Sequence, residues 1–349
     1  MQPTLMETDE IDLIFLISLA RISFLNRAEK IALSKKIDGA DALSLLSIDE
    51  IGAIVGRNIR GAWNGRENIN QAKIEAAVIE AKGINTVLYD DCTYPALLKQ
   101  IPNAPFAIFY RGDISCLHEK TVSVVGTRCL TADGRKAAHD FAYSAVRDGC
   151  TVVSGLARGA DRAAHLGAVD AWFDALEKDA PLPAGKTAAV LPCGIDTVTP
   201  FANMRLSCDI IKSGGCILSE YVPGTPAAKW RFVQRNRIIA ALSPATVVIQ
   251  APTGSGALIT AGLALEYDRD VMFHSTAFSE SALDMDEAIV SRLKRDFAQG
   301  KISRGKIENS CRKYKELGAP IIENYEDYCK CLAEMPGLRS LNSEQMEMF

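Results

Sequence analysis

The sequence has few of the residues from which metal centres and disulfide frameworks are built. Four histidines are scattered over 349 residues, and the ten cysteines include no Cys-x-x-Cys pair. The closest cysteine spacing, Cys329-Lys330-Cys331, is too tight for an ordinary zinc hairpin. We therefore expect no metal site. So many thiols without a pairing pattern are typical of a reducing cytoplasm.

Long hydrophobic runs and a basic leader are also missing. The most apolar early stretch, residues 11–25, contains Asp12 and Arg21 and is too short to span a bilayer. Residues 1–10 are acidic and polar, unlike the basic start of a secretory signal. These features predict a cytoplasmic protein without membrane association.

Positive charge is not in excess. The formal net charge is −4 and the isoelectric point is about 5.7, whereas a nucleic-acid-binding domain is usually basic. This argues only weakly against a nucleic-acid partner, because phosphate binding needs local and not total positive charge. Hydrophobic residues make up 48% of the chain and charged residues 23%, which is typical of a folded protein and not of a disordered one.

The spacing of apolar residues divides the chain into three predicted parts. Residues 1–82 have helical periodicity, and Ser47 followed by Glu50 predicts a capped helix start, so this part is expected to be a small helical domain. Residues 83–335 are expected to form the main domain. The polar residues 336–349 are expected to be a flexible tail.

The main domain alternates short apolar runs with helical segments. Strands that are buried on both faces of a parallel sheet have such continuous apolar runs. We therefore expect an α/β fold with a doubly wound, mostly parallel, Rossmann-like sheet. The predicted strands are residues 121–125, 150–153, 187–191, 216–219, 246–249 and 271–273.

Small and basic residues gather where these strands end, which is where ligands bind in a doubly wound sheet. Glycines there let a phosphate approach the backbone, and helix N-termini favour anions. A lone arginine is better explained by a surface ion pair, but a cluster at one sheet edge favours phosphate. Basic side chains follow these strands at Arg128 and Arg158 and are expected to cluster in one later connection at Lys229, Arg231, Arg235 and Arg237.

Two aromatic residues, Trp230 and Phe232, lie among these charges. Aromatic side chains between cations can stack on the bases of a single strand, although packing of a loop explains either one alone equally well. Gly254 and Ser255 occupy the last of the small-residue turns, after the predicted strand 246–249. The sequence therefore predicts a nucleic-acid groove along this edge.

Motifs for cofactors and catalysis are missing from the same turns. Residues 126–131 do not match the dinucleotide pattern GxGxxG, and Ala257 stands where a phosphate-binding loop would have lysine. Ser154 and Ser255 have no evident histidine partner, and His165 falls within a predicted helix. We therefore expect no cofactor and no catalytic centre.

Four sequence blocks in order resemble the DprA/Smf family, and the resemblance covers residues 84–274. It implies a homodimeric protein without enzymatic activity that binds single-stranded DNA and loads RecA onto incoming DNA in natural transformation. It also implies that the helical domain is SAM-like. The blocks are residues 154–165, 219–226, 231–243 and 255–261, with a lead-in at 94–98 and 110–113. The backbone contacts to DNA that it implies are Arg128, Ser154, Gly155, Arg158, Gly159, Arg235, Asn236 and Arg237.

The chain departs from the family pattern in three places. Thr127 stands where serine is usual, the segment 173–185 is longer than expected, and the sequence after His274 is atypical. The surfaces for dimer formation and for RecA are therefore expected to differ in part.

Two other functions remain as alternatives. One is a nucleotide-processing hydrolase of the cytokinin-activating, lysine-decarboxylase-like Rossmann group, but residues 251–258 lack the threonine and glutamate of its PGGxGTxxE block. The other is a sensor of a small nucleotide. A sensor predicts a closed pocket sized for one nucleotide and not an open basic groove.

Overall fold

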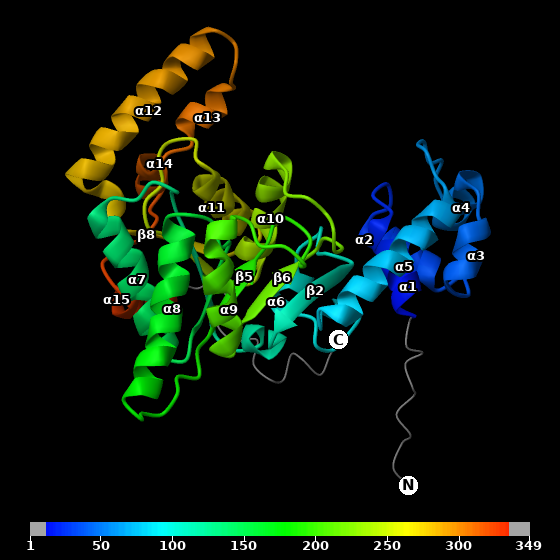
Figure 1. Ribbon diagram of the computed structural model, residues 1–349. Coiled ribbons are helices and arrows are strands. Elements are labelled where there is room, and N and C mark those ends of the chain that lie inside the picture. Colours follow the sequence, from blue (N-terminus) through cyan, green and yellow to red (C-terminus); the bar gives the residue numbers. More distant parts are fainter. Residues whose placement is uncertain (1–11, 335–349) are drawn as a thin grey trace.

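The computed structural model describes residues 12–334, so the predicted tail 336–349 lies outside the described residues. The chain begins with a group of helices, shown in blue in Figure 1. Two of these helices start with capping boxes, formed by Asn26 with Glu29 and by Ser47 with Glu50. The helices are α1 (Leu13–Arg21), α2 (Arg27–Ser34), α3 (Gly39–Leu45), α4 (Ile48–Val55) and α5 (Gly65–Ala81).

A nine-stranded sheet follows, in the order β1-β2-β6-β5-β4-β3-β7-β8-β9. In this order, the seven strands β6, β5, β4, β3, β7, β8 and β9 are parallel to one another. Strand β2 is antiparallel to both of its neighbours, β1 and β6. The predicted mostly parallel, Rossmann-like sheet is confirmed. The strands are β1 (Asn85–Leu88), β2 (Ala107–Gly112), β3 (Thr121–Val125), β4 (Thr151–Ser154), β5 (Thr187–Val190), β6 (Cys216–Ser219), β7 (Ala245–Val248), β8 (Asp270–His274) and β9 (Ile321–Ile322).

Helices cover both faces of the sheet, which explains why its central strands are buried along their whole length. One face packs against α6 (Ala96–Lys99), α10 (Lys229–Ala241), α11 (Gly256–Glu266) and α14 (Cys311–Glu316). The other face packs against α7 (Ala132–Arg147), α8 (Ala160–Glu177), α9 (Met204–Lys212) and α15 (Tyr325–Glu334).

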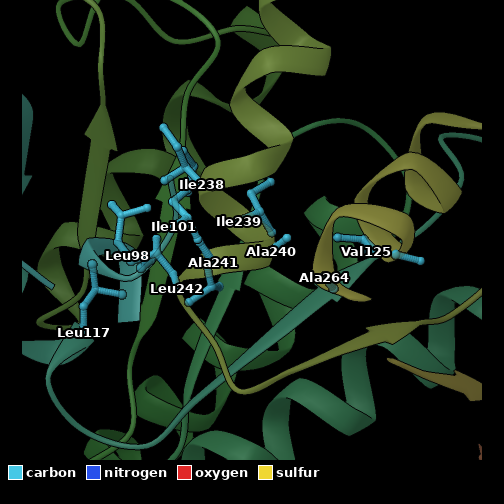
Figure 2. Close-up of a cluster of buried hydrophobic side chains, with 14 of the residues drawn as sticks. Leu98, Ile101, Leu117, Val125, Ile238, Ile239, Ala240, Ala241, Leu242 and Ala264 are labelled. Carbon is cyan, nitrogen blue, oxygen red and sulfur yellow. The ribbon is translucent and has the colours of Figure 1, made fainter. Parts of the chain in front are cut away.

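The second half of α10 is one of the most deeply buried segments. Its run of apolar residues from Ile238 to Leu242 packs against Leu98, Ile101 and Val125 (Figure 2). The Ser123 hydroxyl on β3 donates to the Ile239 carbonyl at 2.7 Å. The position of α10 against the sheet is therefore fixed, and its first half extends to the sheet's carboxyl edge.

The N-terminal helices share a hydrophobic cluster with the sheet. Phe15, Leu33 and Ile79 belong to the same buried cluster as Phe106 and Phe109 of the β2 region. Polar contacts reinforce this packing. The Arg27 guanidinium lies 3.9 Å from the centre of the Tyr89 ring, and the Lys82 ammonium donates to the Asp196 carbonyl at 3.1 Å.

Beyond β8 the chain forms an arm, drawn in orange in Figure 1, that projects from the body at the carboxyl edge of the sheet. It consists of α12 (Glu280–Ala298) and α13 (Arg304–Glu308). No helix within residues 12–334 is long and apolar enough to cross a membrane.

Candidate nucleic-acid interface

The order of the strands reverses between β3 and β7, so the crevice at this switch point is the expected ligand position. Backbone hydrogen bonds tie its turns together. The Thr127 N–H after β3 donates to the Gln250 carbonyl after β7 at 2.7 Å, and the Ala160 N–H donates to the Thr127 carbonyl at 3.1 Å. Three strand ends therefore present one continuous surface.

The β4–α8 turn fits against the β3–α7 turn only because residue 159 is glycine. Gly159 has a φ of +79°, and a side chain there would overlap the Thr127 carbonyl and the Arg128 backbone. Leu156 also has a positive φ, of 54°, and its carbonyl accepts from the Asn203 side chain at 2.8 Å. This restrained turn places the exposed Arg158 beside Arg128.

Arginine and aromatic side chains meet where α10 begins. The Arg128 guanidinium lies 5.3 Å from the centre of the Phe232 ring. Arg231 lies 4.6 Å from the ring of Trp230 and 5.3 Å from that of Tyr221. Trp230 is 57% exposed, and Lys229 is also exposed. Lys229 forms no ion pair with any residue in the described range.

A helix is predicted from Arg235 to Leu242 in this connection, and the structure confirms the helix but starts it six residues earlier, at Lys229. The sequence offers no side-chain cap at Ala228 and no acidic residue in the first turn to mark this start. Helical geometry then separates the four basic residues. Lys229 and Arg231 lie toward the surface, whereas Arg235 and Arg237 are buried.

Arg235 lies inside the molecule with a 3% exposed side chain. It donates to the Val190 carbonyl at the end of β5 at 2.7 Å and fills the space that a side chain on Gly155 would need. Burial lowers the pKa of Arg235 to about 10, partly offset by the charge of Asp161. Burial likewise raises the pKa of Asp161, an effect that Arg235 opposes. The two charges stabilise each other beneath the β4–α8 turn.

Arg237 faces away from this turn and forms a buried ion pair with Glu220. Glu220 also attracts the buried Lys30 of α2, and burial lowers the pKa of Lys30 to about 8.

Ser154 is a third buried member of the predicted set, and its hydroxyl donates to the Val124 carbonyl at 2.6 Å. In this structure Ser154, Arg235 and Arg237 therefore support the turns from within, and the surface beside them is formed by Arg128, Arg158, Lys229, Arg231 and Phe232.

The remaining predicted residues lie around the start of α11. The Asn236 amide donates to the Gly256 carbonyl at 3.3 Å, which ties α10 to α11. Gly254 has a φ of +69°, and its N–H donates to the Asn309 carbonyl at 2.7 Å. Ser255 directly precedes α11, and its enclosed hydroxyl has no hydrogen-bond partner among residues 12–334. The arm therefore covers part of this loop.

Sequence reasoning missed a second group on the same edge. Phe201 is 79% exposed and lies two residues before Asn203, whose side chain donates to the Leu156 carbonyl. The Arg162 Nε donates to the Asn203 side chain at 3.1 Å, and Arg205, two residues after Asn203, is exposed. A single aromatic residue after a proline gave no pattern by which to find this group. It extends the basic and aromatic surface beyond Arg158.

A buried histidine lies below the same turn. His165 is fully buried, and its Nδ1 lies 2.7 Å from the Thr187 hydroxyl, which donates to the Val152 carbonyl. The Thr187 oxygen is therefore the acceptor, so the ring is the neutral tautomer protonated at Nδ1. Burial, together with the charge of Arg235, lowers the pKa of His165 to about 3.

Because His165 is buried in its neutral form, we expect the free energy of unfolding to fall in mild acid. Below the ordinary histidine pKa of 6.5 the unfolded chain takes up a proton that the folded chain refuses. We expect His165 to contribute a fall of about 2 kcal/mol in the free energy of unfolding between pH 7.5 and about pH 5. Urea unfolding of the parent and His165→Asn would measure it. Equal pH profiles for the two proteins would contradict the assignment.

Comparison with known proteins places this surface in context. Residues 85–331 match the family model described as DNA recombination-mediator protein A. The chain is 39% identical over 184 residues to DNA processing protein DprA of Streptococcus pneumoniae and 35% identical over 196 residues to that of Bacillus subtilis. The matches cover 53% and 56% of this chain, and 60% and 62% of those relatives' lengths.

Solved structures agree with the sequence matches. The X-ray structure of DprA from S. pneumoniae superimposes with a TM-score of 0.66 at 28% identity and covers 93% of this chain and 99% of that chain. DNA processing protein A from Helicobacter pylori superimposes with a TM-score of 0.51 at 23% identity, over 72% of this chain and 96% of that chain. The Helicobacter match supports the fold alone.

Proposed function

Because the chain belongs to the DNA recombination-mediator protein A family, we propose that the carboxyl edge of its sheet binds single-stranded DNA. The observation that carries the proposal is the row of basic and aromatic side chains along one edge, all of them exposed except the half-buried Arg231 and Phe232. The row contains Phe201, Arg205, Arg162, Arg158, Arg128, Phe232, Arg231, Trp230 and Lys229. The matched relatives from Streptococcus pneumoniae and Bacillus subtilis are named DNA processing proteins, which supports a DNA ligand.

In the proposed mechanism, positive charge binds the phosphates and aromatic stacking binds the bases. Arginine guanidinium groups hold successive phosphates, and the rings of Phe201, Trp230 and Phe232 stack on bases with little preference for sequence. Gly155 leaves room for the buried Arg235 side chain and Gly159 for the β3–α7 turn, so these glycines hold Arg128 and Arg158 close together. The buried Arg235 and Arg237 hold α10 and the strand ends in place, so the exposed groups need little rearrangement on binding.

The proposal extends to the protein's partners and organisation. The matched segments cover only about three fifths of the first two relatives, so RecA delivery, homodimer formation and action in DNA uptake and recombination are proposals for the whole protein. It would work in the cytoplasm by binding and handing over DNA, without catalysis. Residues 1–82 would form a helical domain, residues 83–335 the DNA-binding domain and residues 336–349 a tail.

Fluorescence anisotropy with a labelled single-stranded oligonucleotide at two salt concentrations tests the ligand. We expect Arg128→Ala to weaken binding about tenfold at low salt and to reduce the slope of log affinity against log salt by about one, because one phosphate contact is lost. Arg147→Ala is the matched control, since Arg147 is an exposed arginine at the end of α7, on the opposite edge. Equal affinity for a duplex, or equal losses in both variants, would contradict the proposal.

A further inference from the structure

The arm holds the loop after β7 closed by hydrogen bonds. The carboxylate of Asp286, on α12, accepts from the Thr253 N–H at 2.6 Å through one oxygen and from the Thr253 hydroxyl at 2.8 Å through the other. Directly after the arm, the Asn309 carbonyl accepts from the neighbouring Gly254 N–H at 2.7 Å. These donors stand at the switch point of the sheet, directly before α11.

The Asp286 carboxylate is the anionic group that these donors hold. Backbone N–H groups and a hydroxyl before a helix N-terminus are donors suited to phosphate oxygens. The Ser255 hydroxyl beside them is enclosed and makes no hydrogen bond within residues 12–334. Thr127, Asp286 and Arg312 line a small cavity of about 60 Å³ at this point, so the covered loop borders the turn that carries Arg128.

The arm itself is weakly attached. Among the 19 residues of α12, only Leu293 is buried. Leu283, Met285 and Phe297 are each more than a third exposed. Because so little apolar surface is buried, detaching the arm costs far less than unfolding the domain. Figure 1 shows the same feature as a projection of α12 and α13 away from the body.

We infer that the arm, residues 280–308, is an autoinhibitory cap whose Asp286 carboxylate occupies a phosphate position of the single-strand site. This inference rests on the proposed function. A phosphate of the strand displaces Asp286 from Thr253, the arm swings away, and the freed donors extend the row that includes Arg128. The measured affinity for DNA is then the affinity of the open form multiplied by the fraction of molecules in which the cap is open.

Two variants of the full chain distinguish release of the cap from the general effect of removing one negative charge. Asp286→Ala removes the carboxylate that contacts Thr253, and Asp284→Ala removes an exposed carboxylate two residues earlier on the same helix. Anisotropy with a ~20-nucleotide polythymidine strand is expected to show about three- to tenfold tighter binding for Asp286→Ala. Asp284→Ala is expected to bind like the parent.

Hydrogen exchange without and with the same strand reads the cap directly. Without DNA, residues 251–256 should exchange faster in Asp286→Ala than in the parent. When the strand is added to the parent, exchange in residues 251–256 should slow down and exchange in α12 should speed up. If the parent binds the strand but the two variants have equal affinity, or α12 exchange does not respond, the cap is disproved while DNA binding stands. If neither parent nor variants bind, the proposed function fails and the cap's role fails with it.

Discussion

Replacing Gly159 with alanine is expected to destabilise the protein by about 2–4 kcal/mol and to abolish tight binding of single-stranded DNA. The backbone at Gly159 has a φ of +79° and a ψ of −124°, a combination that a side chain strongly disfavours. An added methyl group would also overlap the Thr127 carbonyl and the Arg128 backbone. The β3–α7 and β4–α8 turns must separate, which moves Arg128 away from Arg158.

Gly256→Ala is the matched control for this change. Gly256 lies at the start of α11 on the same edge, and a side chain there would meet no atom within 4 Å. We expect its stability to stay within about 0.5 kcal/mol of the parent. Urea unfolding and anisotropy measure both effects. If Gly159→Ala behaved like Gly256→Ala, the close fit of the two turns would not organise the site.

Replacing Arg235 is expected to destabilise the fold, whereas replacing Arg158 is expected to weaken DNA binding alone. Arg235→Met keeps most of the buried volume but removes the donor to the Val190 carbonyl and the charge that opposes the buried Asp161. Losing a buried hydrogen bond together with a compensating charge costs about 2–4 kcal/mol. Arg158 is exposed, so Arg158→Ala should change stability by less than about 0.5 kcal/mol.

Denaturant unfolding and anisotropy on both variants distinguish the two roles. DNA affinity should be measured for Arg235→Met under conditions in which that variant is fully folded. The interior position of Arg235 would be contradicted if Arg235→Met kept the parent's stability and lost DNA affinity as strongly as Arg158→Ala. That result would restore Arg235 as a direct phosphate contact.

The central sheet could be predicted closely because burial on both faces produces an unambiguous pattern. The strands 121–125 and 216–219 were predicted with the bounds that the structure has. An apolar run of strand length marks both segments, and Gly126 marks the end of the first. The turns at the carboxyl edge then followed from the topology of the fold.

The direction of individual side chains could not be predicted in the same way. Arg235 and Arg237 are two residues apart on a helix, so they point in widely different directions, and each is buried by a partner distant in sequence. Sequence reasoning placed both on the surface because charged residues are rarely buried without such partners. The contact between Asp286 and Thr253 likewise joins residues 33 positions apart and has no local signal.

The most direct test of the central claim is to locate the bound strand by photocrosslinking. A single-stranded oligonucleotide carrying 5-iodouracil is irradiated with the full chain, and the adducts are mapped by digestion and mass spectrometry. The account predicts adducts on the segment that contains Trp230 and Phe232 and on the segment that contains Phe201, both on the carboxyl edge of the sheet. Adducts confined to the N-terminal helices or to α15, with none on these two segments, would contradict it.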